Sequence, residues 1–89
     1  MNIEVLTVGL GYIGLPTSAL IANQGTKVLG VDINSEVVNT INKGKIHFVE
    51  PKLDEVVKKV VSEGLFVAST KPKKANVYLI VVPTPFKED

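Results

Sequence analysis

The chain has 89 residues, of which 45% are hydrophobic and 21% are charged. This length allows one domain at most, and so short a chain buries only about 60 to 65% of the surface that it exposes when unfolded. Ten Lys and Arg residues against nine Asp and Glu residues give a net charge of +1, which argues against a nucleic-acid or anionic-membrane partner. The absence of cysteine excludes a disulfide framework, a thiolate metal site and a cysteine nucleophile in this stretch, and we expect no bound metal.

The early apolar run from Val5 to Ala22 has the length of a signal-peptide core. The only charge before it is Glu4, whereas a secretory signal begins with positive charge. The three glycines of this run and Pro16 make it a poor membrane helix, and no other segment approaches the length that spans a bilayer. We therefore expect a soluble, cytoplasmic protein without a membrane partner.

Residues 3–8 form an apolar run that predicts a first strand buried on both faces. The motif G-L-G-Y-I-G follows at residues 9–14 and leads into a helix expected over about residues 12–24. A strand that turns through such a motif into a helix brings unpaired backbone N–H groups to a helix N-terminus, where they bind phosphate. We expect Gly9 to permit the tight turn, Gly11 to leave room for a pyrophosphate and Gly14 to let the helix lie close to the strand.

A second strand is predicted over residues 26–31, and it ends in Asp32. The distance of Asp32 from the first glycine matches the position of the acidic residue that accepts hydrogen bonds from the adenosine ribose hydroxyls. A carboxylate there repels a 2′-phosphate, and residues 33–35 offer no cation to hold one. The pattern therefore favours NAD over NADP, against the alternative that Asp32 only caps the helix that follows.

The rest of the chain continues the alternation of strands and helices. The remaining predicted elements are a helix capped by Asn34 or Ser35, a connector over 45–50, a helix that starts at Pro51 and stops at Gly64, a strand over 65–68, a turn or short helix over 70–75 and a strand over 77–82. With right-handed crossovers, this order predicts a parallel sheet with strand order 3-2-1-4 and helices on both faces. We expect a truncated Rossmann-like α/β fold, in which residues 1–89 are the N-terminal portion of a dinucleotide-binding domain.

Four ordered blocks carry a resemblance to a known family. They are V-G-L-G-Y-I-G-L-P at 8–16, G-V-D-I-N at 30–34, I-H-F-V-E-P at 46–51 and V-P-T-P-F-K at 82–87. Together they resemble the N-terminal region of the UDP-glucose/GDP-mannose dehydrogenase family. The resemblance implies an enzyme that oxidises the C6 alcohol of a nucleotide sugar to a carboxylate by two NAD-dependent hydride transfers, through a thioester on a cysteine.

The same resemblance assigns the residues that hold NAD. Those for the ADP half of the cofactor are Gly9, Gly11, Tyr12, Ile13, Gly14 and Asp32, and Thr84 would reach toward the middle of the cofactor. The family's catalytic residues and substrate domain lie downstream, so we expect no catalytic residue in this stretch. His47 is the only histidine, and nothing around it in the sequence defines a catalytic triad.

The resemblance also implies a substrate and an assembly state. The blocks at 47–51 and 83–87 look closer to the branch that acts on UDP-N-acetyl-D-mannosamine than to the UDP-glucose or GDP-mannose branches. We expect a UDP-sugar substrate and a homo-oligomer. Two other classes stay open: a stand-alone NAD-sensing module, and a Rossmann-like interaction domain without a ligand, against which the glycines and Asp32 argue. The length of the natural reading frame would separate them.

Overall fold

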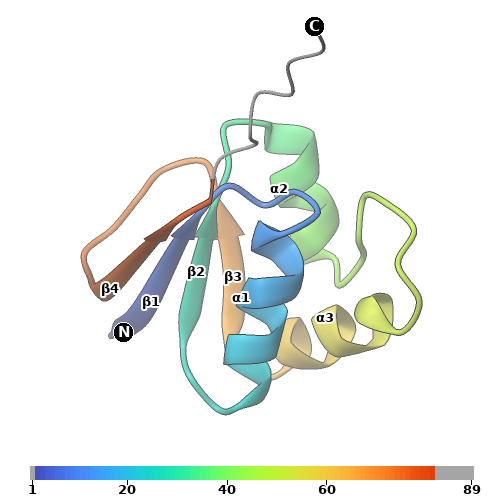
Figure 1. The fold of residues 1–89 in the computed structure, drawn as a ribbon, viewed down its shortest axis with the longest axis horizontal. Coiled ribbons are helices and arrows are strands. Elements are labelled where there is room, and N and C mark those ends of the chain that lie inside the picture. Colours follow the sequence, from blue (N-terminus) through green and yellow to red (C-terminus); the bar gives the residue numbers. More distant parts are fainter. Residues whose placement is uncertain (1, 82–89) are drawn as a thin grey trace, which may run out of the picture.

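The computed structural model describes residues 2–81. Its elements, in chain order, are β1 (Ile3–Val8), α1 (Gly14–Asn23), β2 (Val28–Val31), α2 (Ser35–Asn42), α3 (Leu53–Ser62), β3 (Phe66–Ser69) and β4 (Ala75–Ile80). The four strands are parallel and follow the order β3-β2-β1-β4, which confirms the predicted Rossmann-like sheet (Figure 1). Among the helices described, none is both long and apolar enough to cross a membrane.

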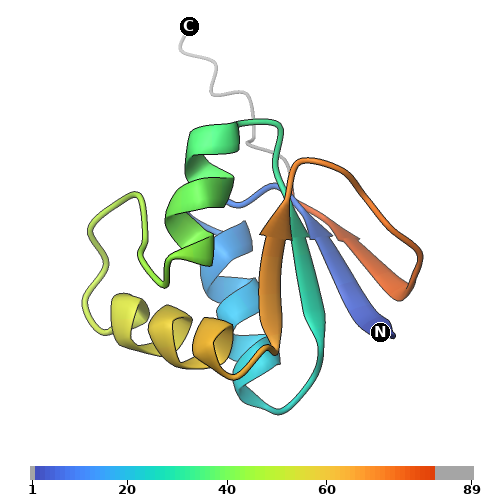
Figure 2. The ribbon, with the colours of Figure 1, turned by 180° about the vertical axis from the view of Figure 1, so that it is seen from behind.

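The three described helices lie together on one face of the sheet (Figures 1 and 2). One core cluster joins buried residues of all three helices to the sheet, including Ala19 of α1, Ile41 of α2, Val57 of α3 and Phe66 of β3. The opposite face carries a second, smaller cluster that draws its buried residues from the strands alone. The expectation of helices on both faces is therefore not met within residues 2–81, although the strand order is correct.

The connection between β3 and β4 explains why the second face has no helix here. These strands lie at opposite edges of the sheet, so residues 70–74 must pass from one edge to the other. Neighbouring strands are about 4.8 Å apart, and a helix advances only about 1.5 Å per residue. The connection is thus too short for a helical crossover, and the predicted turn or short helix is an irregular turn.

Strand β4 is the most exposed strand of the sheet: it is an edge strand that pairs only with β1, and unlike the other edge strand, β3, it contributes no buried residue to the core cluster beneath the helices. It begins and ends two residues earlier than predicted, and Val77, Tyr78 and Ile80 are 45%, 51% and 69% exposed. Tyr78 therefore does not pack in the core, and its hydroxyl accepts a hydrogen bond from the Ala75 N–H at 2.9 Å. A continuous apolar run does not distinguish an edge strand from a central one.

The starts of α2 and α3 differ in how well the sequence predicts them. Asn34 is the N-cap of α2, as one of the two expected candidates, and its side chain accepts hydrogen bonds from the N–H groups of Glu36 and Val37 at 2.9 and 3.3 Å. Helix α3 begins at Leu53 and not at Pro51, because Lys52 has a left-handed backbone conformation with φ of 69°. Pro51 therefore lies in the turn before the helix.

Thr7 in the middle of β1 offers a test of the packing on the sheet. The residue is fully buried, yet its hydroxyl has no hydrogen-bond partner within residues 2–81. An unpaired buried hydroxyl costs about 1–3 kcal/mol, so we expect Thr7→Val, which replaces the hydroxyl with a methyl group, to raise the free energy of unfolding by about 1 kcal/mol. Urea unfolding measures the change. Thr7→Ser is the control and should be destabilising, whereas a Val variant less stable than the parent would contradict the assignment.

Candidate functional site

The loop between β1 and α1 and the turn between β2 and α2 lie at the carboxyl end of the parallel sheet (Figure 1). Ligands of open α/β sheets bind at this end of the strands. The Gly9 N–H donates to the Val31 carbonyl at 2.8 Å, which joins the start of the loop to the end of β2. Gly9 itself has φ of 101°, a conformation that glycine adopts without strain.

The three motif glycines differ in what a side chain at each would meet. A Cβ on Gly9 would collide with the carbonyl oxygen of Val81, and one on Gly14 would collide with the carbonyl oxygen of Gly9. These two glycines are therefore required by close approach of the backbone. In contrast, a Cβ on Gly11 would meet nothing within 4 Å, so this exposed position leaves open space above the loop.

The N-terminus of α1 presents unpaired donors to this open space. Within residues 2–81, the N–H groups of Gly11, Tyr12 and Ile13 donate to no other residue, and the N-cap residue Ile13 makes no side-chain capping bond. Pro16 lies in the first turn of α1, where its missing N–H leaves no intrahelical bond unmade. The arrangement has the features that favour an anion, because the positive end of the helix dipole adds to these donors.

Leu10 holds the loop in place, a role that sequence analysis missed. Its side chain is fully buried, and a Cβ on Gly30 of β2 would lie 2.7 Å from Leu10 Cδ2 and 2.9 Å from Phe66 Cε1. Gly30 is thus required because the side chains of Leu10 and Phe66 occupy the space above it. The signal in the sequence was the glycine within an apolar strand, which often marks a close approach.

Asp32 faces the same loop from the end of β2. Its Oδ2 accepts a hydrogen bond from the Leu10 N–H at 3.0 Å, and its Oδ1 accepts one from the Asn34 N–H at 3.0 Å. The alternative that Asp32 only caps α2 is wrong, because Asn34 supplies that cap. Ile33 follows with 94% of its surface exposed, so an apolar side chain borders the carboxylate.

Tyr12 of the glycine loop contacts the connector between α2 and α3. Its ring centroid lies 4.6 Å from that of Phe48, which in turn has an edge-to-face contact with His47 at 4.9 Å. Tyr12 remains 75% exposed, and Phe48 packs against the core cluster beneath it. The aromatic contact joins the loop to the connector, and His47 takes part as a packing residue on its rim.

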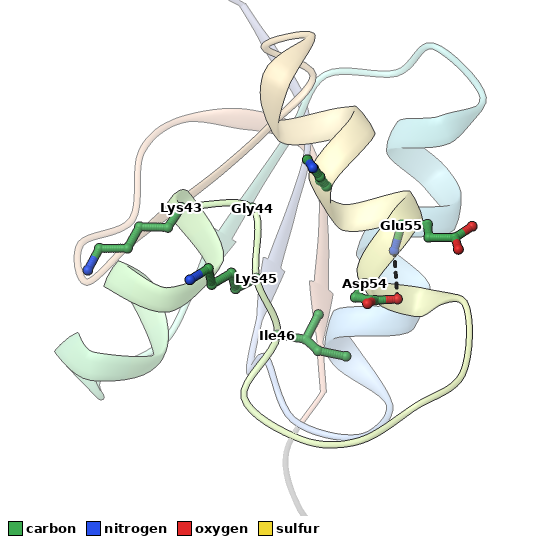
Figure 3. Close-up of a pocket in the computed structure, with 7 residues that line it drawn as sticks. Lys43, Gly44, Lys45, Ile46, Asp54 and Glu55 are labelled. Atoms are coloured by element: carbon green, nitrogen blue, oxygen red, sulfur yellow. Dashed lines mark hydrogen bonds between the residues drawn. The ribbon is translucent and has the colours of Figure 1, made fainter.

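A hollow of about 480 Å³ lies elsewhere, between the end of α2 and the start of α3 (Figure 3). Its lining residues are Lys43, Gly44, Lys45, Ile46, Asp54, Glu55 and Lys58. The Lys43 side chain extends away from α3, and Asp54 accepts a hydrogen bond from the Glu55 N–H, so the charged groups do not converge (Figure 3). Among residues 2–81, none of the predicted cofactor residues lines this hollow.

Two further expectations concern Thr84 and metal binding. Thr84 lies outside the described residues. In the part of the chain that the structure describes, no group of three or more His, Cys, Asp and Glu residues is arranged to hold a metal ion. The candidate site therefore consists of the glycine loop and Asp32, together with the residues that position them.

The geometry of the site agrees with the family to which the sequence is similar. Residues 1–89 match the model of the NAD-binding domain of the UDP-glucose/GDP-mannose dehydrogenase family. The chain belongs to this family. The family assignment identifies the glycine loop and Asp32 as parts of an NAD-binding domain.

Three similar proteins have the names of nucleotide-sugar dehydrogenases. The chain is 57% identical over 90 residues to UDP-N-acetyl-D-mannosamine dehydrogenase of Yersinia pestis, covering 100% of this chain and 21% of that protein. It is 56% identical to the Campylobacter jejuni enzyme of the same name, covering 97% and 21%. It is also 52% identical to NDP-N-acetyl-D-galactosaminuronic acid dehydrogenase of Ralstonia solanacearum, covering 96% and 20%. The chain thus spans about a fifth of the length of these relatives.

Solved structures of the family have the same fold in this region. UDP-N-acetyl-mannosamine dehydrogenase of Staphylococcus aureus superimposes with a TM-score of 0.90 at 46% identity, covering 97% of this chain and 21% of that one. GDP-mannose dehydrogenase of Pseudomonas aeruginosa gives a TM-score of 0.90 at 32% identity with the same coverage. The fold alone therefore does not distinguish these two activities.

The glycines allow a test that separates folding from binding. We expect Gly11→Ala to change the free energy of unfolding by no more than about 0.5 kcal/mol, because the added methyl group meets open space. Gly14→Ala should lower it by about 1–3 kcal/mol or more, because its Cβ collides with the Gly9 carbonyl. Urea unfolding of both variants measures the difference. Equal destabilisation by the two substitutions would show that the loop does not have this conformation.

Proposed function

We propose that the protein containing this chain is an NAD-dependent nucleotide-sugar dehydrogenase that oxidises the C6 alcohol of UDP-N-acetyl-D-mannosamine to the uronate with two NAD. The observation that carries the proposal is the pairing of three backbone donors, at Gly11, Tyr12 and Ile13, which have no partner within residues 2–81, with the Asp32 carboxylate across the same loop. The donors suit a diphosphate, and the carboxylate suits a ribose diol.

Within this proposal the chain's residues bind and orient the adenosine diphosphate half of NAD. The three N–H groups would donate to the diphosphate oxygens, and Gly11 leaves the backbone accessible to them. The Asp32 oxygens would accept hydrogen bonds from the ribose hydroxyls, and Ile33 offers an exposed apolar surface beside them. We retain Thr84 as the residue that reaches toward the middle of the cofactor. NAD supplies the hydride acceptor for each of the two oxidations.

The choice of substrate rests on relatives and on the amino-acid blocks of the sequence. Two relatives that are 56–57% identical act, by name, on UDP-N-acetyl-D-mannosamine. We propose that residues 1–89 are the N-terminal portion of the NAD-binding domain and that the catalytic residues and the sugar site belong to a further part of the protein. The cytoplasmic location and the homo-oligomeric state stay predictions of the sequence.

An alternative substrate is favoured by one specific observation. The GDP-mannose dehydrogenase structure superimposes on this chain as well as the Staphylococcus aureus enzyme does. GDP-mannose is therefore the second candidate, and UDP-glucose the third. A stand-alone NAD sensor has less support, because the relatives named here are dehydrogenases about five times as long as this chain.

The cofactor proposal predicts selectivity for NAD over NADP. The full natural polypeptide that contains this chain should bind NAD more tightly, because the Asp32 carboxylate repels a 2′-phosphate. Asp32→Ala should weaken NAD binding by about 1.5–3 kcal/mol and reduce the preference, as the lost acceptor is charged. Calorimetric titration with both cofactors measures this, and Asp54→Ala on α3 is the matched control. An unchanged NAD to NADP ratio in Asp32→Ala would refute the role of Asp32.

The substrate proposal predicts the order of activity among three nucleotide sugars. The same full-length protein should form NADH fastest with UDP-N-acetyl-D-mannosamine, and two NADH per sugar should accumulate at completion. Absorbance at the NADH maximum follows the reaction with this sugar, UDP-glucose and GDP-mannose in parallel. Faster turnover with either of the other sugars would show that the proposed substrate is wrong and that this sugar is the substrate. The absence of NADH formation with all three sugars would refute the proposed activity.

A further inference from the structure

Asp32 makes two hydrogen bonds to the backbone before any ligand is considered. One of its oxygens accepts from Leu10 N–H and the other from Asn34 N–H, both at 3.0 Å. The Leu10 bond crosses from the end of β2 to the glycine loop, beside the Gly9 N–H bond to Val31. Because the Leu10 side chain is fully buried, its backbone has little freedom, and the carboxylate fixes the direction of its N–H.

A carboxylate can form these bonds and still bind a ribose. Its two oxygens offer about four lone pairs, so one acceptor position remains on each oxygen. An amide side chain has a single acceptor oxygen, and its nitrogen only donates. With Asp32→Asn, either the Leu10 N–H or the Asn34 N–H would therefore face the side-chain NH2 group, which cannot accept a hydrogen bond.

We propose that Asp32 is a positioning residue for the diphosphate-binding loop, in addition to its role as ribose acceptor. This inference rests on the proposed function, because it concerns the same NAD site. Leu10 directly precedes the three residues whose N–H groups have no partner in the described part of the chain, so a fixed Leu10 amide also fixes the position of the donors that follow it. The ribose and the diphosphate are then recognised through one carboxylate, which contacts the first and orients the backbone for the second.

The proposal and a purely ribose-binding role predict opposite results for a ligand without ribose hydroxyls. If Asp32 only binds the ribose, removal of its negative charge leaves such a ligand unaffected or tightens its binding, since the carboxylate repels a diphosphate. If Asp32 also positions the loop, the same substitution weakens binding despite the lost repulsion. The sign of the change therefore decides between the two.

The binding experiment compares ADP with 2′,3′-dideoxy-ADP on the full natural polypeptide. We expect Asp32→Asn to weaken dideoxy-ADP at least about fivefold, and ADP further, in calorimetric titrations. Asp54→Asn is the matched control: Asp54 accepts a backbone N–H bond at 2.9 Å on α3, away from the loop, and both affinities should stay within twofold. Unchanged or tighter binding of dideoxy-ADP to Asp32→Asn would overturn the proposal.

Hydrogen exchange in the ligand-free protein tests the same idea without any cofactor. The Leu10 amide should exchange more slowly than the amides of Gly11 and Tyr12, and Asp32→Asn should remove that protection while helix α3 is unchanged. If Asp32→Asn does not fold, the unmodified protein alone decides: equal exchange at Leu10 and Gly11 would overturn the positioning role. Failure of the unmodified protein to bind either nucleotide would refute the proposed function. The exchange experiment would then still decide whether Asp32 positions the loop, because it needs no nucleotide.

Discussion

The packing of Leu10 above Gly30 is the constraint on which the candidate site depends. Because β2 has no side chain at Gly30, Leu10 reaches into the core and touches the position that a Cβ would fill, with Phe66 beside it. A buried residue in the middle of a ligand-binding loop fixes the loop to the sheet. The residues on its C-terminal side then have no need to pack inward, and their N–H groups have no partner among residues 2–81.

Among the helices within residues 2–81, α1 differs from the other two in how its N-terminus is stabilised. Helix α2 has a full side-chain cap from Asn34, and α3 has two acidic residues in its first turn. Helix α1 has neither a capping side chain within residues 2–81 nor an acidic residue near its start. Such an end costs stability, which the burial of Leu15, Ala19 and Ala22 on the same helix offsets. A bound diphosphate would complete the missing cap.

The sequence predicted those features that depend on local chemistry. The roles of Gly9 and Gly14, the Asn34 cap and the strand order follow from short motifs and from the order of elements. The Leu10 contact and the pairing of Tyr12 with Phe48 join residues that are far apart in the chain, so a local pattern does not identify the partners: Gly30 within an apolar strand marks a close approach but not the residue that approaches. The exposure of β4 and the bare face of the sheet also escaped prediction, because an apolar run does not say which neighbours will cover it.

The central place of β1 in the sheet has a consequence for how the chain folds during synthesis. Strand β1 leaves the ribosome before both of its partners, and β2 follows soon after. Its other partner is β4, with Ile3 paired to Ala75, so this side of β1 waits until the chain up to β4 has been made. Closing so long a loop costs more entropy and slows folding relative to local pairing. Among the strand pairings within residues 2–81, the pairing of β1 with β4 therefore forms last, and until then a nascent chain exposes this edge of β1 to chaperones or to other chains.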